Sequence, residues 1–289
     1  MNVDVATTAV DQTVRRAAVM GSPIKHSLSP VLHGAAYRAL DLRGWHYDKI
    51  ECDEPGLPGL VDGMGPEWTG LSLTMPLKRV ALTVADEVSP LAEAVGAANT
   101  LVFPAAGPAG GRQAHNTDVA GMVSTLREAG LTRVEQAVIL GAGGTAQAAL
   151  AAARELGHQS PIVLVRNLAR TGELRETAER LGMRPVISDG LFTEPLPPAD
   201  LVISTLPGGA ADPLSATRWK PDTMVLDVVY APWPTSFAGS ALAAGCPVVS
   251  GLTVLLYQAV AQVELMTGRP GPVEAMRTAL AAAVAARQG

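Results

Sequence analysis

The sequence predicts an α/β protein with two domains, on the strength of three observations. From residue 17 onward, short aliphatic and β-branched runs alternate with alanine- and leucine-rich stretches, the pattern of strands alternating with helices. A glycine-rich turn follows one predicted strand and precedes a predicted helix. The chain has 289 residues, of which 48% are hydrophobic, so it can bury the cores of two domains.

The first half of the chain contains four predicted strands and one clear helix. The stretches "AAVMG", "HYDKIE", "GLSLTM" and "ANTLVF" have the aliphatic and β-branched composition of strands. The stretch "SPVLHGAAYRAL" predicts a helix with Ser29 as its N-cap and Pro30 at the first helical position. The glycine- and proline-rich residues 104–112 predict a hairpin or loop.

The second half contains one complete strand–helix–strand unit. A helix that begins near residue 117 precedes this unit, which consists of "QAVIL", "TAQAALAAARELG" and "PIVLVRN". Further strands are predicted at "ADLVISTL", "TMVLDVVY" and "CPVVSG". Two helices, "LTVLLYQAVAQVELMTG" and "PVEAMRTALAAAVAARQ", end the chain.

Composition and charge argue against several classes of function. The net charge is −5 and there is no basic run, which argues against nucleic acid as a partner. No apolar stretch approaches the roughly 18 residues of a membrane span, and the N-terminus lacks the basic region of a signal peptide. Two distant cysteines and five scattered histidines predict neither a disulfide nor a metal site. We therefore expect a cytoplasmic protein without a metal.

The segment "GAGGTA" (141–146) fits the G-x-G-x-x-G/A pattern of dinucleotide-binding loops. In that pattern the first glycine allows a tight turn, the second lets a pyrophosphate approach the backbone, and the small third residue permits helix–sheet packing. A purely structural turn is the alternative, but the complete strand–turn–helix context favours nucleotide binding. The predicted contact residues are Gly141, Ala142, Gly143, Gly144, Thr145 and Ala146.

The end of the next strand indicates which nucleotide is bound. An NAD site usually has an acid about 20 residues beyond the glycine loop, where it binds the ribose 2′-hydroxyl. Here "VRNLAR" offers Arg166, Asn167 and Arg170 and no acid. Two guanidinium groups suit a 2′-phosphate, so we expect NADP as the cofactor. The alternative is that both arginines only solvate the start of a helix.

A lysine follows the strand-like run "SLTMP" in a chain that otherwise prefers arginine. The chain has 22 Lys plus Arg, and only Lys25, Lys49, Lys78 and Lys220 are lysine. A lysine amine can release a proton whereas a guanidinium cannot, so Lys78 is a candidate for proton transfer. The alternative is a solvated surface amine.

Six stretches resemble motifs of one enzyme family. "GSPIKHSLSP" resembles G-x-P-[IV]-x-H-S-x-S-P, "SLTMPLK" resembles N-[VL]-T-x-P-x-K, and "GAANT" resembles G-A-x-N-T. "HNTD" matches [DH]-N-T-D, "GAGGTA" the nucleotide loop, and "GLTVLLYQA" G-x-x-[MLV]-L-x-x-Q-A. In this order, over about residues 17 to 285, the chain resembles the shikimate dehydrogenases.

The resemblance implies two α/β domains. One is a substrate-binding domain built from the N-terminal part plus the C-terminal helices, and the other is a Rossmann-type NADP-binding domain. The expected boundaries are a frayed N-terminal arm at 1–16, the substrate-binding domain at 17–117, the NADP-binding domain at 118–250, and returning C-terminal helices at 251–289.

The same resemblance implies roles for individual residues. Lys78 matches the catalytic lysine, Asp118 matches its partner, and Gly251 lies where the family meets the nicotinamide end of the cofactor. The implied substrate-binding residues are Ser27, Ser29, Thr74, Asn99, Tyr230 and Gln258. The two serines would bind the substrate carboxylate, and the tyrosine would line the site.

Structural explanations stay open for some of these residues. Ser27 and Ser29 are also typical helix-capping residues, Asn99 could be a turn residue, and Asp118 could be the N-cap of the following helix. There are also two departures from the family pattern. Ser72 replaces the usual asparagine, and the usual N-R-T reads "VRN" here.

The implied reaction is the NADPH-dependent reduction of 3-dehydroshikimate to shikimate, a step in chorismate and aromatic amino acid biosynthesis. Alternatives are a quinate/shikimate or aminoshikimate dehydrogenase, or a non-catalytic NADP-binding sensor. A sensor predicts loss of the lysine–aspartate pair, and both Lys78 and Asp118 are present. The expected partner is a small-molecule substrate, and the sequence leaves monomer and homodimer both open.

Overall fold

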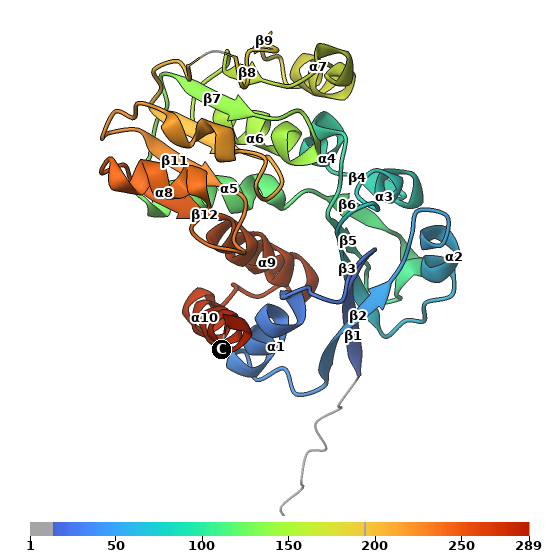
Figure 1. Ribbon diagram of the computed structural model, residues 1–289. Helices are drawn as coiled ribbons and strands as arrows, with labels where there is room; N and C mark the ends of the chain where they lie inside the picture. Colours follow the sequence, from blue (N-terminus) through green and yellow to red (C-terminus); the bar gives the residue numbers. More distant parts are fainter. Residues whose placement is uncertain (1–13, 194, 289) are drawn as a thin grey trace, which may run out of the picture.

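The computed structural model describes residues 14–193 and 195–288, which form two six-stranded sheets with helices around them (Figure 1). The first sheet is built from residues 15–115 and the second from residues 137–250. The two-domain α/β fold expected from the sequence is thereby confirmed.

The first sheet is mixed, with strand order β2-β1-β3-β5-β6-β4. β1 is parallel to β2 and β3, whereas β5 is antiparallel to β3 and β6. Every residue of β3 is buried, as expected for a central strand that is covered on both faces. The strands are β1 (Arg15–Gly21), β2 (Trp45–Glu51), β3 (Trp68–Leu73), β4 (Glu87–Val88), β5 (Thr100–Val102) and β6 (Gln113–His115).

The second sheet is parallel throughout, with strand order β12-β11-β10-β7-β8-β9. The chain runs from β7 through β8 to β9 and then returns to place β10 on the other side of β7. Ligands of such sheets bind at this switch point, beyond the carboxyl ends of the strands. The strands are β7 (Ala137–Leu140), β8 (Ile162–Leu164), β9 (Val186–Ser188), β10 (Leu201–Ser204), β11 (Met224–Asp227) and β12 (Val248–Ser250).

The last two helices return to the first sheet, as the family resemblance implied. α9 packs on α5 and also reaches β3 and β5, while α10 lies beside α1 (Figure 1). The helices are α1 (Ser29–Ala39), α2 (Leu57–Asp62), α3 (Val80–Val84), α4 (Pro90–Val95), α5 (Asp118–Glu128), α6 (Gly144–Glu155), α7 (Gly172–Arg180), α8 (Ser236–Ala243), α9 (Gly251–Thr267) and α10 (Val273–Gln288). Short 3-10 helices lie at η1 (Pro108–Gly110), η2 (Leu168–Arg170) and η3 (Asp212–Ala216). None of the helices in the described ranges is long and apolar enough to cross a membrane.

Two details of the predicted first domain are corrected. β1 begins at Arg15, two residues earlier than expected, because the backbone of Arg15 and Arg16 already pairs with Trp45 and His46 of β2. Residues 1–13 of the predicted arm lie outside the described residues. Ser29 is the first residue of α1 and not its N-cap, a position taken by Leu28.

Apolar clusters tie the helices to their sheets. α1, α9 and α10 share one cluster, to which Leu32, Leu256 and Met276 contribute. Val95 of α4 is buried in the cluster of the second sheet together with residues of α5, α6 and α7. Helix α4 therefore connects the two halves of the molecule.

Candidate active site and cofactor groove

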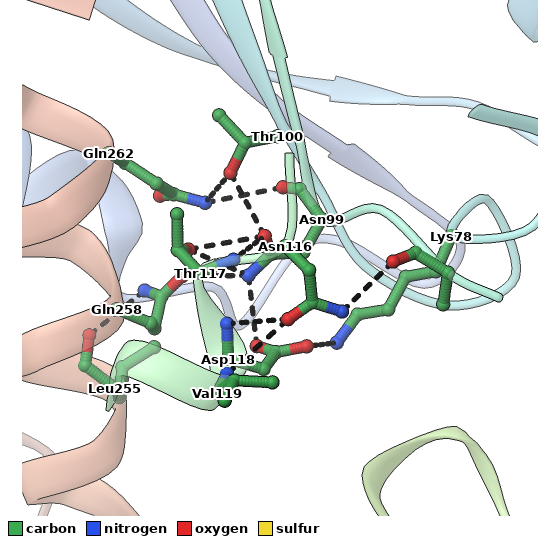
Figure 2. A network of polar contacts seen from close by, with 11 residues as sticks. Lys78, Asn99, Thr100, Asn116, Thr117, Asp118, Val119, Leu255, Gln258 and Gln262 are labelled. Atoms are coloured by element: carbon green, nitrogen blue, oxygen red, sulfur yellow. Dashed lines mark hydrogen bonds and ion pairs between the residues drawn. The ribbon is translucent and has the colours of Figure 1, made fainter. Parts of the chain in front are cut away.

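Lys78 and Asp118 meet in a polar network beyond the ends of β3 and β6 (Figure 2). Nζ of Lys78 donates a hydrogen bond of 2.6 Å to Oδ2 of Asp118, and Nδ2 of Asn99 donates one of 2.9 Å to Oδ1. The lysine and aspartate side chains are only 26% and 19% exposed. Both carboxylate oxygens are therefore occupied, and the carboxylate is held from two sides.

Asn116 accepts hydrogen bonds from the free backbone N–H groups at the amino end of α5. Its Oδ1 accepts hydrogen bonds from the backbone N–H groups of Asp118 and Val119, at 3.1 and 3.3 Å. The prediction that Asp118 caps this helix is wrong, since Thr117 is the N-cap residue and Asp118 is the first helical residue. Freed from capping, the Asp118 carboxylate is available to Lys78.

Asn99 and Gln258 complete the inner part of the network. Asn99 is buried, and its Oδ1 accepts a hydrogen bond of 2.8 Å from the backbone N–H of Thr117. Its Nδ2 also lies 3.5 Å from Oε1 of Gln258, whose own Nε2 donates to the carbonyl of Leu255. The structure thus brings together four residues predicted from separate motifs: Lys78, Asn99, Asp118 and Gln258.

A second glutamine, not predicted from the sequence, extends this network behind the site. Gln262 is 1% exposed, and its Nε2 donates to the carbonyl of Asn99 and to Oγ1 of Thr100, at 3.2 and 3.1 Å. Its Oε1 accepts a hydrogen bond of 2.7 Å from Ser72, which in turn accepts one of 2.6 Å from the hydroxyl of Tyr47. Burial raises the pKa of Tyr47, so this hydroxyl keeps its proton and remains a donor.

The predicted carboxylate-binding serines lie between β1 and the start of α1. The hydroxyl of Ser27 accepts a hydrogen bond from the backbone N–H of Ser29 at 3.3 Å. The Ser29 carbonyl accepts a bond of 3.0 Å from Nδ1 of His33, whose ring stacks on Tyr47. Because Tyr47 in turn donates to Ser72, the start of α1 is connected through His33 and Tyr47 to the network behind the site.

Thr74 and Tyr230 each follow a strand, one in each sheet. Thr74 follows β3 and packs so closely on Gly21 that a Cβ at that glycine would lie 2.4 Å from the threonine methyl carbon. Tyr230 follows β11 and packs, half-buried, against the cluster of α1, α9 and α10. Thr74 therefore lies beside the end of β1, and Tyr230 packs on the cluster that includes Leu28, the residue between the two serines.

A groove of about 890 Å³ opens at the carboxyl ends of β7, β8 and β10. Gly141 and Gly143 line it; Gly141 has a φ of +110°, and a Cβ there would lie 2.6 Å from Oγ1 of Thr205. A Cβ at Gly143 or Gly144 would meet nothing within 4 Å, and no side chain caps the amino end of α6. This open cradle of backbone amides fits the pyrophosphate of a dinucleotide.

The remaining residues of the predicted loop take different positions. Ala142 lines the groove, whereas Ala146 is fully buried in the core beneath it, as expected for the packing position of the motif. Thr145 is half-buried and does not line the groove. Gly251 lies apart from the groove at the start of α9, where a Cβ would lie 1.9 Å from the carbonyl oxygen of Val228.

Charged residues gather at one end of the groove. Arg166, Asn167 and Arg170 all line it, and neither arginine forms an ion pair within the part of the chain that the structure describes. The stretch at residues 165–170 has no acid, as the sequence shows, but an acid from further along the chain reaches the groove. Glu173 also lines the groove, because the first turn of α7 brings it back beside the arginines.

Comparison with known proteins agrees with this geometry. The model of the shikimate dehydrogenase substrate binding domain matches residues 19–101, and that of the shikimate 5'-dehydrogenase C-terminal domain matches residues 251–281. A shikimate dehydrogenase (NADP(+)) of Desulfitobacterium hafniense is 37% identical over 277 residues, covering 94% of this chain and 99% of that protein. The chain belongs to the shikimate dehydrogenase family.

Solved structures of shikimate dehydrogenases have the same fold. The Mycobacterium tuberculosis protein is 44% identical with a TM-score of 0.82, over 93% of this chain and 99% of its own. The Thermus thermophilus protein, in complex with NADP(H) and shikimate, is 31% identical with a TM-score of 0.78, over 93% and 100%. A quinate dehydrogenase of Corynebacterium glutamicum in complex with NAD is 28% identical with a TM-score of 0.82, over 93% and 99%.

For this member of the shikimate dehydrogenase family, sequence reasoning missed several residues of the network. Asn116 lies within the "HNTD" motif, so that motif already contained its signal. Gln262 lies one helical turn after Gln258 and so on the same face of α9, a spacing that could have identified it. Tyr47 and Glu173 had no local signal, since each reaches the site only through the packing of distant elements.

Proposed function

We propose that this chain is an NADP-dependent shikimate dehydrogenase in which Lys78 and Asp118 are the catalytic residues. The observation that carries the proposal is the contact of 2.6 Å between Nζ of Lys78 and Oδ2 of Asp118. It joins the turn after β3 to the first turn of α5, beside the residues that match the family's substrate motifs. When bound, NADPH supplies a hydride to the carbonyl carbon of 3-dehydroshikimate.

Lys78 then supplies the proton that the reaction requires. One hydride on carbon and one proton on oxygen convert the ketone into the hydroxyl of shikimate, and in the oxidation direction Lys78 takes the hydroxyl proton back. Asp118 holds the amine through Oδ2, while Asn99 holds Oδ1 and prevents the carboxylate from turning. The protein thus contributes a positioned proton and a defined substrate orientation.

The substrate is held at two ends in this proposal. Ser27 and Ser29 bind its carboxylate at the start of α1, where the helix dipole favours an anion. Thr74, Asn99 and Gln258 bind the ring hydroxyls and the reacting carbonyl, and Tyr230 lines the site. Each of these assignments follows from the family motifs and from the positions described above.

The cofactor occupies the groove of the second sheet. The loop of residues 141–146 receives the pyrophosphate. The family resemblance puts the nicotinamide end of the cofactor near Gly251, beyond the residues that line the groove. Arg166, Asn167 and Arg170 bind the 2′-phosphate, because planar guanidinium groups match phosphate oxygens in pairs. The names of the relatives, which specify NADP(+), support this assignment.

A four-way assay tests the function. Shikimate and quinate are each offered with NADP⁺ and with NAD⁺, and reduced cofactor is followed by absorbance. We expect shikimate with NADP⁺ to give the highest kcat/KM. A preference for quinate with NAD⁺ would favour the second candidate, a quinate dehydrogenase, whose solved relative shares the fold. No turnover of either substrate would favour the sensor.

Three further assignments belong to this proposal. The proposed domain boundaries are 15–117 and 251–288 for the substrate domain, which take in all of β1, and 118–250 for the cofactor domain. A cytoplasmic location accords with Cys52 and Cys246, which are both buried and free. The proposal includes a monomer or a homodimer as the working form of the enzyme.

A further inference from the structure

One ion pair connects the catalytic segment to the cofactor groove. Arg79 directly follows Lys78, and its Nη1 lies 2.7 Å from Oε1 of Glu173, on the first turn of α7. The two neighbouring residues thus reach different partners, Asp118 for the lysine and Glu173 for the arginine. Arg79 and Glu173 are 51% and 52% exposed, so the contact lies at the mouth of the groove and not in the core.

The position of Glu173 is unexpected in a groove for a phosphorylated ribose. Arg166 and Arg170 line the groove with two positive charges, and Glu173 is the one acid among its lining residues in the described part of the chain. A carboxylate at this end of a dinucleotide site ordinarily favours a ribose 2′-hydroxyl and repels a 2′-phosphate. The groove therefore contains an element that opposes NADP.

Two contacts restrain this carboxylate. Oε1 pairs with Arg79, and Oε2 accepts a hydrogen bond of 3.3 Å from Nε2 of Gln147. Gln147 is 1% exposed on α6, so its amide is a fixed anchor. Helix α7 is itself anchored on α4, where Thr177 donates a hydrogen bond of 3.0 Å to the carbonyl of Val95. Gln147 and the anchoring of α7 thus hold Glu173 in place, and Arg79, which follows β3 of the first sheet, neutralises its charge.

We propose that Arg79 is a positioning residue for cofactor choice: by pairing with Glu173 it cancels the single negative charge in the groove and so favours NADP over NAD. The inference rests on the proposed NADP-dependent function and adds to it a residue from the opposite sheet. In this arrangement the charge of the cofactor groove depends on the turn that also carries Lys78.

Equilibrium binding of NADP⁺ and NAD⁺ to the purified protein, followed by calorimetry without substrate, tests the proposal. We expect Arg79→Met to raise the Kd for NADP⁺ by about 3- to 10-fold, the effect of one uncompensated charge at a half-exposed site. The Kd for NAD⁺ should stay unchanged or fall. Added salt should reduce the effect, because exposed charges are screened. Arg43→Met, which breaks the exposed pair with Asp41 far from the groove, is the matched control.

The double variant Arg79→Met/Glu173→Gln tests whether Arg79 acts on cofactor binding through Glu173. If Arg79 acts through Glu173, removing the carboxylate as well should restore the wild-type Kd for NADP⁺. A double variant as weak as Arg79→Met would overturn the proposal, because Arg79 would then act without Glu173. If Arg79→Met leaves the ratio of the two Kd values unchanged, with both cofactors bound equally well or equally weakly, the proposal would be overturned as well. Shikimate oxidation by the wild type, measured on the same preparation, separates failure of this inference from failure of the proposed function.

Discussion

Nζ of Lys78 lies 2.6 Å from Oδ2 of Asp118, although the two residues are 40 positions apart in the sequence and belong to different elements. The turn after β3 carries the lysine, and the first turn of α5 carries the aspartate. The contact is shielded, because both side chains are less than a third exposed. This pair is therefore the first place to test the proposed chemistry.

Two replacements of Lys78 distinguish a role in proton transfer from a purely electrostatic role. General acid–base catalysis contributes about 10²- to 10⁴-fold, so Lys78→Ala should lower kcat for shikimate oxidation by at least about a hundredfold. The guanidinium of Lys78→Arg keeps the positive charge but cannot readily exchange its proton, so this variant should be nearly as slow as Lys78→Ala. Steady-state rates across pH, with NADP⁺ binding followed separately, provide the measurement. An arginine variant within a few-fold of wild type would leave only an electrostatic role for Lys78.

Ser29→Ala tests the carboxylate end of the substrate site. Losing one hydrogen bond to a charged group costs about 1.5–3 kcal/mol, so the KM for shikimate should rise roughly 10- to 150-fold. Helix stability should change little, because Ser29 is not the N-cap of α1. Ser236→Ala is a control for the loss of a serine hydroxyl at a helix start, since Ser236 is also the first residue of its helix, although it is exposed and Ser29 is buried. An unchanged KM for shikimate would remove Ser29 from the site.

Arg166→Ala tests the recognition of the 2′-phosphate. The KM for NADP⁺ should rise by about tenfold or more, since a charge-assisted contact to phosphate is lost, while the KM for NAD⁺ should hardly change. Arg184→Ala, an exposed arginine that does not line the groove, provides the comparison. Equal use of both cofactors by the wild type would contradict the assignment.

Gln262→Leu tests the buried network behind the site. The change removes three hydrogen bonds and leaves Ser72 and Thr100 without this partner, so the free energy of unfolding should fall by about 2–4 kcal/mol. Asn99 loses a restraint, so kcat should fall more than the KM for shikimate changes. Urea unfolding and steady-state kinetics measure the two effects, with the exposed Gln159→Leu as control. A fully stable variant with normal kcat would show that Gln262 is only a packing residue.

His33 makes the stability of the first domain depend on pH. Burial lowers the pKa of His33 from 6.5 to about 4, so the unfolded chain binds more protons than the folded chain between these values. Stability should therefore fall as pH decreases through this window, by at most about 1.4 kcal/mol per pH unit. His33→Phe keeps a ring against Tyr47 and should flatten this slope in urea unfolding experiments. An equally steep slope in the variant would assign the effect to other groups.

Much of the fold follows from local chemistry that a sequence displays directly. The alternation of strands and helices, the glycine loop at 141–146 and the closing helices are all set by side-chain periodicity and backbone freedom. Gly141 is a clear case, because its positive φ and its contact with Thr205 exclude any side chain. Lys78, Asp118, Asn99 and Gln258 were likewise predictable, because each lies in its own short motif.

Only the tertiary structure determined which groups each of these side chains contacts. Both Ser29 and Asp118 have the residue type of a helix cap, yet Ser27 and Asn116 satisfy the local amides instead. Capping depends on backbone angles at a helix end, which the residue type alone does not set. Glu173 meets Arg79 across 94 positions, and Gln262 meets Ser72 across 190. Such contacts arise from how the sheets and α9 pack together. That packing depends on many apolar side chains at once, so no local sequence pattern predicts it.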